Sequence, residues 1–188
     1  MTEPNLSTPR LLLRPFKPTD APRLQQLAGD RRVAATTLRI PHPYEDGMAE
    51  AFIADSNRSL NAGESCRLAI VKRDGKELIG AMGLEIEPVH ARAELGYWIG
   101  ADYWGQGYAT EAGLAMVRHG FETLKLNRIM GHCFAGNRAS ARVLQKLGMT
   151  LEGRLAQHVC KWGEYLDVEL YAVVRSHSAI RRADSSAC

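Results

Sequence analysis

The chain has 188 residues, 45% of them hydrophobic and 24% charged, and a formal net charge of +3 at pH 7. This length and composition are typical of one globular domain with a substantial core. No window approaches the roughly 20 consecutive apolar residues of a membrane span, and the charge is too small to indicate a nucleic-acid partner.

The four cysteines are scattered without a C-x-x-C pair, and the six histidines are equally dispersed. No zinc-type spacing results, and a disulfide framework is not expected in a chain of this size, so we expect no metal site. The first ten residues, MTEPNLSTPR, lack a basic region followed by an apolar core. We therefore expect no signal peptide and a cytoplasmic location.

The first third of the chain predicts a strand and two helices. RLLLRPF (10–16) is typical of a strand, and Thr19 and Asp20 then offer cap chemistry for a helix that ends at Gly29. Residues 30–63 are less regular. They contain the turn-rich RIPHPYEDG, followed by MAEAFIADSNRSL with apolar residues at helical spacing.

The centre of the chain predicts three strands and a helix. Two strand-like runs flank Asp74-Gly75, a dipeptide suited to a tight primed turn, and AELGYWIG (93–100) adds a third strand. Apolar and small residues then recur at i, i+3, i+4 and i+7, which predicts a helix face. That face consists of Ala109, Ala112, Gly113, Met116, Val117, Gly120, Phe121 and Leu124.

The last part predicts a strand over 127–134, a helix over 137–148 and two final strands around Trp162-Gly163-Glu164. Asn137 is a favourable N-cap for that helix, and Gly148 is a favourable stop. The order of elements is strand, helices, three strands, helix, strand, helix and two strands, with no internal repeat or linker. This order predicts one mixed α/β domain.

Gly105 and Gly107 lie in the turn between a predicted strand and the helix after it. The first turn of a helix has unpaired N–H groups and the positive end of the helix dipole, and glycines leave those groups accessible to an anion. The P-loop pattern fails because no lysine lies in this turn. The dinucleotide pattern G-x-G-x-x-G fails because its last position is Thr110.

The segment WGQGYA (104–109) resembles the pyrophosphate-binding motif of the GNAT N-acetyltransferases, Arg/Gln-x-x-Gly-x-Gly/Ala. The departure is Trp104, which stands where the motif has arginine or glutamine. NRASARVLQKLGMTLEGR (137–154) resembles a segment of the ribosomal-protein (RimJ/RimL-like) branch of that family. AELGYWIGADYWGQGYATEA, GEYLDVELYAVV and LLLRPFKPTDA resemble the centre, last strand and start of the same branch.

The resemblance implies the GNAT fold: a mixed, mostly antiparallel central sheet of about seven strands, splayed at its centre, with helices on both faces. It implies one acetyltransferase domain over 1–176 and a C-terminal tail over 177–188, which no recognised motif covers. It also implies acetyl-CoA as the acetyl donor and a primary amine as the acceptor, without a metal.

The resemblance also assigns roles to residues. The pyrophosphate should lie on amides of the glycine turn, and the pantetheine arm should run beside the backbone of Tyr97, Trp98 and Ile99. Asn137 should contact that arm, in addition to capping its helix. The amides that should bind the pyrophosphate belong to Gly105, Gln106, Gly107, Tyr108, Ala109 and Thr110.

Two residues are candidates for acid and base. The resemblance makes Ser140 the proton donor to the departing thiolate. Because a hydroxyl is far less acidic than a thiol, we expect a stabilising hydrogen bond or a relayed proton rather than full proton transfer from Ser140. The alternative for Ser140 is a small residue packed inside its helix. A primary amine is mostly protonated at pH 7 and needs a base to remove that proton. Glu94 is the candidate base, and Gly96 and Trp98 are expected on the same face of its strand. The competing bases are Glu85, Glu87 and His90.

The acceptor cavity should be formed by residues 30–63 and the last hairpin, with His42, Tyr44, His158 and Tyr165 as possible lining residues. We therefore predict an N-acetyltransferase in which a protein N-terminal α-amine or a small-molecule amine attacks acetyl-CoA directly. The alternatives are a non-catalytic coenzyme A sensor and a ribosome- or RNA-associated module. A homodimer is plausible by family analogy. A valine at Gly107 should weaken acetyl-CoA binding and leave the fold largely intact.

Overall fold

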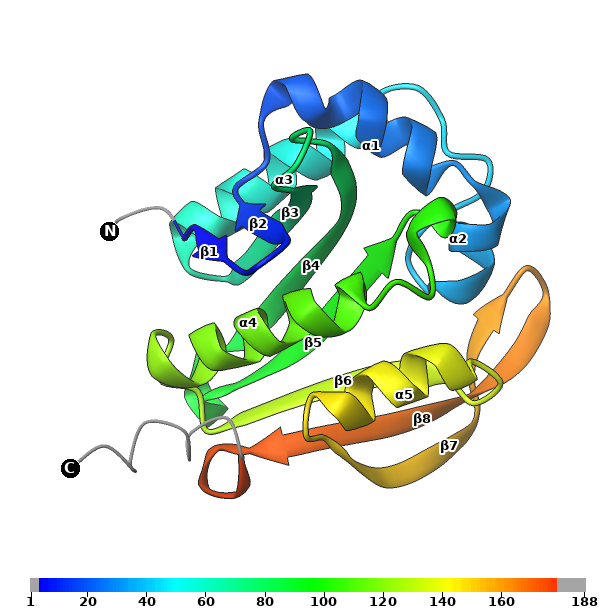
Figure 1. The fold of residues 1–188 in the computed structure, drawn as a ribbon. Helices are drawn as coiled ribbons and strands as arrows, with labels where there is room; N and C mark the ends of the chain where they lie inside the picture. The colour runs from blue at the N-terminus through cyan, green and yellow to red at the C-terminus, as the bar shows by residue number, and fades with distance from the viewer. Residues whose placement is uncertain (1–3, 179–188) are drawn as a thin grey trace.

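The computed structural model describes residues 4–178 and shows one eight-stranded sheet with helices on both faces (Figure 1). The strand order across the sheet is β1-β2-β3-β4-β5-β6-β8-β7. Every neighbouring pair is antiparallel except β5 and β6, which are parallel. The strands are β1 Leu6–Ser7, β2 Leu11–Arg14, β3 Ser65–Lys72, β4 Leu78–Glu87, β5 Arg92–Ile99, β6 Arg128–Phe134, β7 Thr150–Lys161 and β8 Glu164–Val174.

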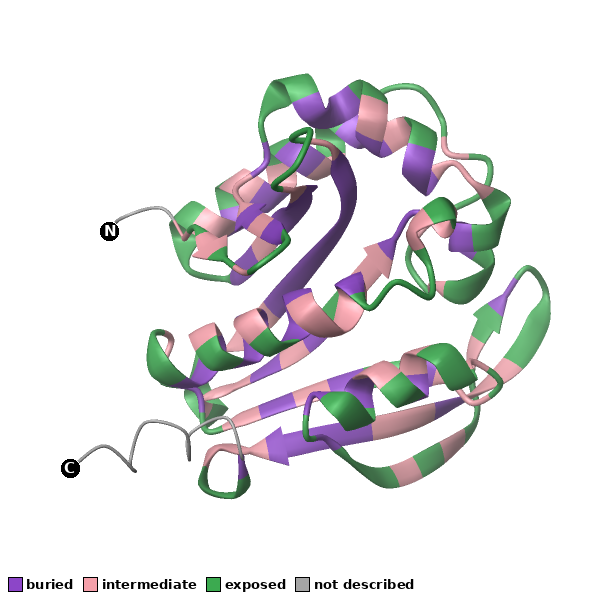
Figure 2. Cartoon of the chain, viewed as in Figure 1, coloured by how far each residue is buried: buried purple, intermediate pink, exposed green. Residues whose placement is uncertain are grey.

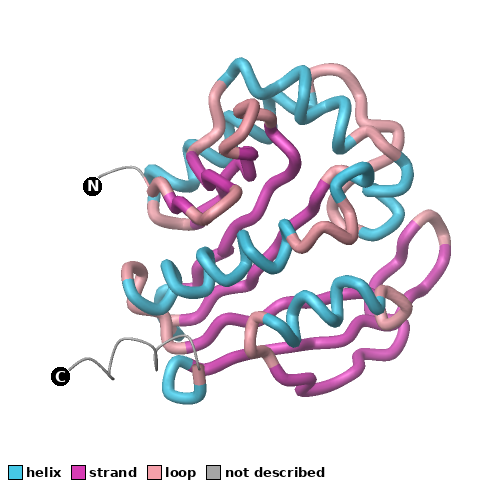
Figure 3. The backbone as a smooth tube through the Cα atoms, in the orientation of Figure 1, coloured by secondary structure: helices cyan, strands magenta, loops and turns pink. Residues whose placement is uncertain are grey.

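The described residues form five α-helices, shown in the backbone tube of Figure 3, and α1, α3, α4 and α5 pack against the sheet. Three of them fall between β2 and β3, one connects β5 to β6, and one connects β6 to β7. They are α1 Ala21–Ala28, α2 Arg31–Thr36, α3 Met48–Ala62, α4 Tyr108–Glu122 and α5 Arg138–Lys146, and short 3-10 turns occur at Pro18–Asp20, Pro88–His90, Ala101–Tyr103 and Arg175–His177. None of the described helices is long and apolar enough to cross a membrane.

The two faces of the sheet bury different hydrophobic clusters, which appear in Figure 2 as purple segments along the strands and on the inward sides of the helices. On one face, Met116 and Val117 of α4 and Leu144 of α5 pack against alternate residues of β2–β6. On the other face, α1 and α3 pack over Ala69 and Ala81. We call these the α4–α5 face and the α1–α3 face.

The predicted element order and mixed α/β fold are confirmed, with three refinements. The sheet has eight strands rather than about seven because Leu6–Ser7 pairs with β2 as a two-residue strand. The irregular region after Gly29 contains the short helix α2, capped by the Asp30 side chain. The turn at Asp74-Gly75 is longer than a two-residue primed turn, since Lys72 N bonds Glu77 O and both Gly75 and Lys76 have positive φ.

The predicted face of α4 is confirmed, and its glycines are sites of close packing. A Cβ added at Gly113 would lie 2.7 Å from Leu147 side-chain atoms, and one at Gly120 would lie 2.7 Å from Ile129 Cδ1. These positions allow α4 to approach the sheet and α5 closely. The proposed division into a domain over 1–176 and a tail stays a prediction, and residues 179–188 lie outside the described residues.

The parallel pair β5–β6 is hydrogen-bonded over only part of its length. Its register covers four pairs, from Arg92↔Arg128 to Leu95↔Gly131. Beyond Leu95, β5 continues beside β4 alone, and beyond Gly131, β6 continues beside β8 alone. The sheet therefore splays between these two strands, as the fold expected from the sequence requires.

One nearly buried ion pair fixes the connection from β2 to α1. Arg14 Nη1 and Nη2 lie 2.7 and 2.8 Å from the two carboxylate oxygens of Asp20, and Lys17 N donates to the same carboxylate at 2.8 Å. The Arg14 and Asp20 side chains are only 14% and 9% exposed. Burial by itself would raise the pKa of Asp20, but the hydrogen bonds from Arg14 and Lys17 outweigh it and lower that pKa.

We expect Asp20→Asn to lower the free energy of unfolding at pH 7 by about 3 kcal/mol, because it leaves the Arg14 guanidinium buried without its charge partner. A carboxyl whose pKa is lowered in the folded state contributes stability above its unfolded-state pKa and loses it as pH falls through the folded-state value. The difference between wild type and variant should therefore shrink on acidification. Urea unfolding at several pH values measures this, with the exposed Asp74→Asn as the matched control. A loss no larger than that of the control would contradict it.

Candidate active site

A cavity of about 670 Å³ passes through the sheet where β5 and β6 separate. From the α4–α5 face it is lined by Leu95, Tyr97 and Ser140, and from the α1–α3 face by Glu94 and Gly96. Neighbouring side chains of a strand point to opposite faces of the sheet. Residues of both faces can therefore line one cavity only where the gap between β5 and β6 connects the two faces. The splay therefore joins the two faces of the sheet in one chamber.

Charged side chains from adjacent strands form a row on the α1–α3 side of the cavity. Arg67 of β3 binds Glu85 of β4, with Nε–Oε1 2.5 Å and Nη2–Oε2 2.9 Å. Glu94 of β5 stands directly opposite Glu85 in the ladder, and His132 Nδ1 of β6 lies 3.3 Å from Glu94 Oε1. The guanidinium of Arg39 lies 3.9 Å from the other Glu94 oxygen.

These neighbours change the proton affinity of Glu94. The hydrogen bond with His132 lowers the pKa of Glu94, burial opposes that effect, and the charges of His132 and Arg39 lower it further. Glu94 is therefore a carboxylate throughout the neutral pH range. With its proton on Nδ1, beside this carboxylate, the His132 imidazole would keep on Nε2 a lone pair that can accept a proton.

The α4–α5 side of the cavity contains a pair of hydroxyl groups. Tyr97 Oη and Ser140 Oγ are 2.8 Å apart, and Ser140 lies in the first turn of α5. Burial raises the pKa of the Tyr97 phenol to about 12, against a lowering by Ser140. Burial likewise raises the pKa of the nearby Cys133 thiol, to about 11. All three groups are therefore neutral at pH 7.

The glycine turn has the backbone geometry that an anion site needs. Gly105 and Gly107 have φ of +75° and +82°, and Gly107 is the N-cap of the 15-residue helix α4, with no side chain capping its first amides. A Cβ added at Gly105 would meet nothing within 4 Å. The turn is therefore open to solvent above the first amides of α4.

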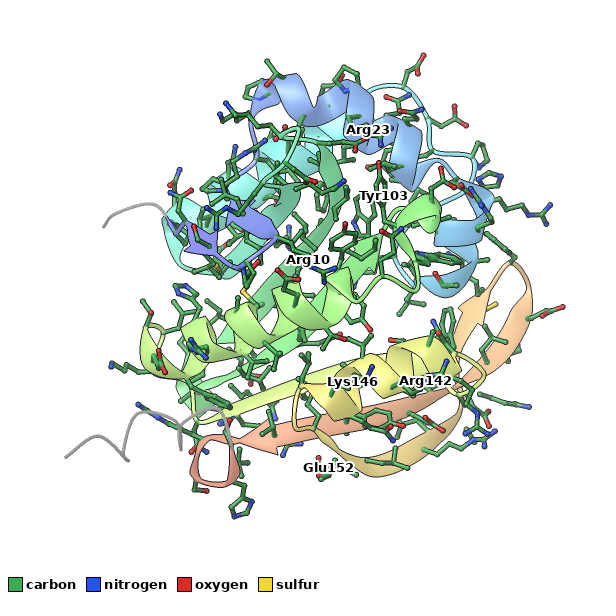
Figure 4. All side chains as sticks on the ribbon, viewed as in Figure 1. Arg10, Arg23, Tyr103, Arg142, Lys146 and Glu152 are labelled. Atoms are coloured by element: carbon green, nitrogen blue, oxygen red, sulfur yellow. The ribbon has the colours of Figure 1, made fainter. Side chains whose placement is uncertain are left out.

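Arg10, in the connection between β1 and β2, reaches this turn. Its Nη1 donates to Gln106 O at 3.0 Å, its Nε donates to Glu111 Oε2 at 2.6 Å, and its guanidinium lies 4.6 Å from the centre of the Tyr108 ring. Glu111 also accepts from the Thr8 hydroxyl at 2.6 Å. Figure 4 shows Arg10 beside the beginning of α4. The contact supports the turn and places a cation next to it.

Two aromatic residues support the turn from the side of β5. The indole N–H of Trp104, at the departure from the family motif, donates to Ile99 O at 2.7 Å. The Tyr103 hydroxyl accepts from Arg23 of α1 at 2.7 Å, and Figure 4 labels this pair. Trp104 therefore makes a backbone contact within the turn region instead of offering the guanidinium or amide that the motif usually has.

The predicted site residues divide into three groups. Glu94, Tyr97, Trp98 and Ser140 line the cavity, and of the predicted acceptor residues Tyr44 and His158 also line it. Asn137 caps α5, its side-chain oxygen accepting from Ser140 N at 3.0 Å, and Ile99 lies outside the lining. The residues from Gly105 to Thr110 form the glycine turn and the first residues of α4, and they lie outside the cavity lining.

The remaining candidates are arranged differently from the sequence expectation. Of the competing bases, Glu85 lines the cavity, whereas Glu87 and His90 pair with each other away from it. His42 lies against the Trp162 ring at the hairpin tip, and neither His42 nor Tyr165 lines the cavity. The sequence reasoning missed His132, Arg39, Arg67 and Arg10. The one sequence signal for His132 was its place as a polar residue inside the predicted strand over 127–134.

A family model described as acetyltransferase (GNAT) domain matches residues 10–150. This match covers most of the chain and includes β5, the glycine turn and α5. The chain belongs to the GNAT acetyltransferase family. The resemblance read from its motifs is confirmed, and so is the expected enzyme class, an acetyl-CoA-dependent N-acetyltransferase.

Relatives of this acetyltransferase differ in the acceptors that their names give. Ribosomal-protein-serine acetyltransferase of Escherichia coli (strain K12) is 38% identical over 104 residues, which are 55% of this chain and 57% of that protein. Spermidine N(1)-acetyltransferase of the same strain is 29% identical over 153 residues, 81% of this chain and 80% of that protein. A crystal structure of a GNAT-family acetyltransferase from Bacillus anthracis superposes with a TM-score of 0.79 at 26% identity, covering 91% of this chain and 98% of the other.

Acetyl-CoA is the cosubstrate of this family, as the sequence resemblance implied. Within residues 4–178, no group of three or more histidine, cysteine, aspartate or glutamate side chains is arranged to hold a metal ion.

The φ of +82° at Gly107 changes the expectation for a valine at this position. A β-branched residue is strained there whatever the free space, so we expect Gly107→Val to lower the free energy of unfolding by about 1–3 kcal/mol. Gly96→Val is the matched control, since Gly96 has an ordinary strand φ and a Cβ there would meet nothing within 4 Å. Thermal unfolding of both variants measures the difference. Equal melting temperatures would contradict the assigned backbone conformation.

Proposed function

We propose that this enzyme transfers the acetyl group of acetyl-CoA to a primary amine inside the cavity that crosses the sheet. The observation that carries the proposal is this cavity, with a hydroxyl pair on the α4–α5 side and a carboxylate–imidazole pair on the α1–α3 side. The glycine turn follows β5 after the short 3-10 turn Ala101–Tyr103, so a donor held at the glycine turn would extend along β5 to the cavity. The acceptor would enter from the α1–α3 side.

The residues of the turn fit the pyrophosphate of acetyl-CoA. The amides from Gly105 to Thr110 lie at the positive end of a helix of 15 residues, and a Cβ added at Gly105 would meet nothing within 4 Å. Arg10 contributes a positive charge, although Glu111 balances part of it. The arm of the cosubstrate would then follow Tyr97, Trp98 and Ile99 as an additional strand beside the splayed β5, with Asn137 near its path.

The carboxylate–imidazole pair is suited to removing the proton of the acceptor ammonium. We assign the role of base to Glu94 acting through His132, because the lowered pKa of Glu94 makes it a weak base by itself. The amine nitrogen then forms its bond to the acetyl carbon while the bond from that carbon to sulfur breaks. No covalent intermediate on the enzyme is needed, and the cavity residues serve to orient, desolvate and accept a proton.

On the other side, Ser140 and Tyr97 are suited to stabilising the departing thiolate. Both hydroxyls are less acidic than a thiol, whose pKa is about 8.5 in a model peptide. Neither group would therefore give up its proton fully at pH 7. A hydrogen bond from Ser140, itself oriented by Tyr97, would stabilise the negative sulfur until a solvent proton reaches it.

The acceptor remains either a protein N-terminal amine or a small-molecule amine, as the relatives' names illustrate. The cytoplasmic location and the homodimer also stay predictions.

The test of the proposed function is to measure acetyl-CoA binding by calorimetry and then to follow thiol release with a pool of N-terminal peptides and small amines. Tight binding with amine-dependent release is expected. Binding without release for any amine would favour the non-catalytic sensor instead.

We expect Glu94→Gln and His132→Gln each to lower kcat by about a hundredfold at pH 7.5, since each removes one member of the carboxylate–imidazole pair. Because the pKa of Glu94 is lowered, acidification through the range in which histidines titrate cannot act through Glu94 itself. A fall in wild-type activity across that range, which His132→Gln no longer shows, would identify the imidazole as the proton acceptor. His90→Gln is the matched control, because His90 also lies beside a carboxylate, Glu87, but outside the cavity. An unchanged pH profile in His132→Gln would contradict the assignment.

A further inference from the structure

The charges that line the cavity cancel one another. Among the described lining residues, the carboxylates are Glu85 and Glu94 and the cations are Arg67 and Arg39, with two histidines. Each carboxylate has a partner, since Arg67 binds Glu85 through two nitrogens while His132 and Arg39 flank Glu94. Arg67 is itself shared with Asp55 of α3, at 2.6 Å. The lining therefore offers one site for an amine, beside Glu94 and His132, and no surplus carboxylate for a second ammonium group.

The wall beyond this charged row is apolar. It is formed by Leu24 of α1, Phe52 of α3 and Trp98 of β5, together with Tyr44 in the loop before α3. Leu24 belongs to the buried core of the α1–α3 face, and Tyr44, Phe52 and Trp98 pack on that core while remaining partly exposed. Phe52 is held by an edge-to-face contact with Phe16, whose ring centre is 5.4 Å away. The wall is therefore a preformed aromatic and aliphatic surface that lines the cavity.

We infer that the acceptor is a molecule with a single primary amine on an apolar body, the amine beside Glu94 and His132 and the body against the wall of Leu24, Tyr44, Phe52 and Trp98. This inference rests on the proposed function and narrows its substrate class. The same chemistry occurs in a free alkyl or aryl amine and in a peptide whose first residue has a bulky apolar side chain.

Polyamines lack the features that this surface recognises. A second ammonium group a few carbons from the first would lie against the apolar wall, where an unpaired charge is strongly disfavoured. An uncharged methyl or phenyl group in the same place would instead bury apolar surface that was exposed to water, which favours binding. The cavity should thus discriminate between acceptors that differ only in the charge of their far end.

The matched pair hexylamine and 1,6-diaminohexane tests this discrimination, because the two differ by one terminal ammonium group. Thiol release at saturating acetyl-CoA gives kcat/KM for each, and we expect the monoamine to be preferred by at least about tenfold. Equal or better use of the diamine would overturn the inference while leaving the acetyltransferase function intact. Failure of both amines and of the peptides below, despite acetyl-CoA binding, would overturn the proposed function on which the inference rests.

Two peptides of otherwise identical sequence, one beginning with phenylalanine and one with serine, distinguish the two sources of this chemistry. A preference for the phenylalanine peptide over both the serine peptide and hexylamine would assign the wall to a protein N-terminus. A preference for hexylamine over both peptides would assign it to a small molecule. Both results support an apolar acceptor, whereas a preference for the serine peptide over all other acceptors would overturn it.

A variant of the wall provides an independent test. Phe52→Glu adds an unpaired carboxylate to the apolar surface and should shift the ratio of kcat/KM for the two amines by at least tenfold toward 1,6-diaminohexane. Ala51→Glu is the matched control, since Ala51 precedes Phe52 on α3 and is exposed outside the cavity. An unchanged ratio in a folded Phe52→Glu variant would contradict the assignment of the wall. If that variant does not fold, the ratio measured on the wild-type enzyme decides the inference.

Discussion

The separation of β5 from β6 after four paired residues is the constraint on which the rest of the site depends. A continuous sheet would keep its two faces apart, with Tyr97 and Leu95 on one side and Glu94 and Gly96 on the other. At the splay, backbone groups of β5 lose their partners on one edge and the space between the strands becomes a cavity lined from both sides. The α4–α5 face can then serve the donor while the α1–α3 face serves the acceptor.

The packing of the two faces maintains this separation. The α4 helix approaches the sheet and α5 closely at Gly120 and Gly113, and it begins at the glycine turn that follows β5 and a short 3-10 turn. A rigid helix therefore sets the position of the glycine turn relative to the cavity. On the opposite face, α1 and α3 hold the apolar wall in place. The charged row across β3–β6 lies on the acceptor side of the cavity, where Arg67 pairs with Glu85 and Arg39 lies beside Glu94. Acceptor recognition therefore depends on one amine position and an apolar surface rather than on net charge.

Patterns among neighbouring residues in the sequence predicted the helices, turns and caps that depend only on such neighbours. The period of α4, the glycine turn, the Asn137 cap and the order of helices and strands along the chain all follow from residues close together in the chain. Because motifs flank them, Glu94, Tyr97 and Ser140 were predicted as site residues. Arg10 and Arg39 were not, because their partners lie 101 and 55 positions away, and nothing in a linear pattern identifies which arginine will cross that distance. The same limitation applied to His132, whose role arises from the parallel register of β6 with β5. The two-residue strand β1 has too few residues to show a period.

The measurement that tests the central claim most directly is a comparison of coenzyme A binding and acetyl transfer in Gly96→Leu. Gly96 lies on the α1–α3 side of the gap, and a Cβ there meets nothing within 4 Å, so the strand tolerates a side chain while leucine fills the passage. If the acetyl group passes through this gap, the variant should bind coenzyme A with affinity near that of the wild type, and its transfer rate should fall by at least a hundredfold, with Gly96→Ala in between. A Gly96→Leu enzyme that transfers acetyl groups at the wild-type rate would contradict the account.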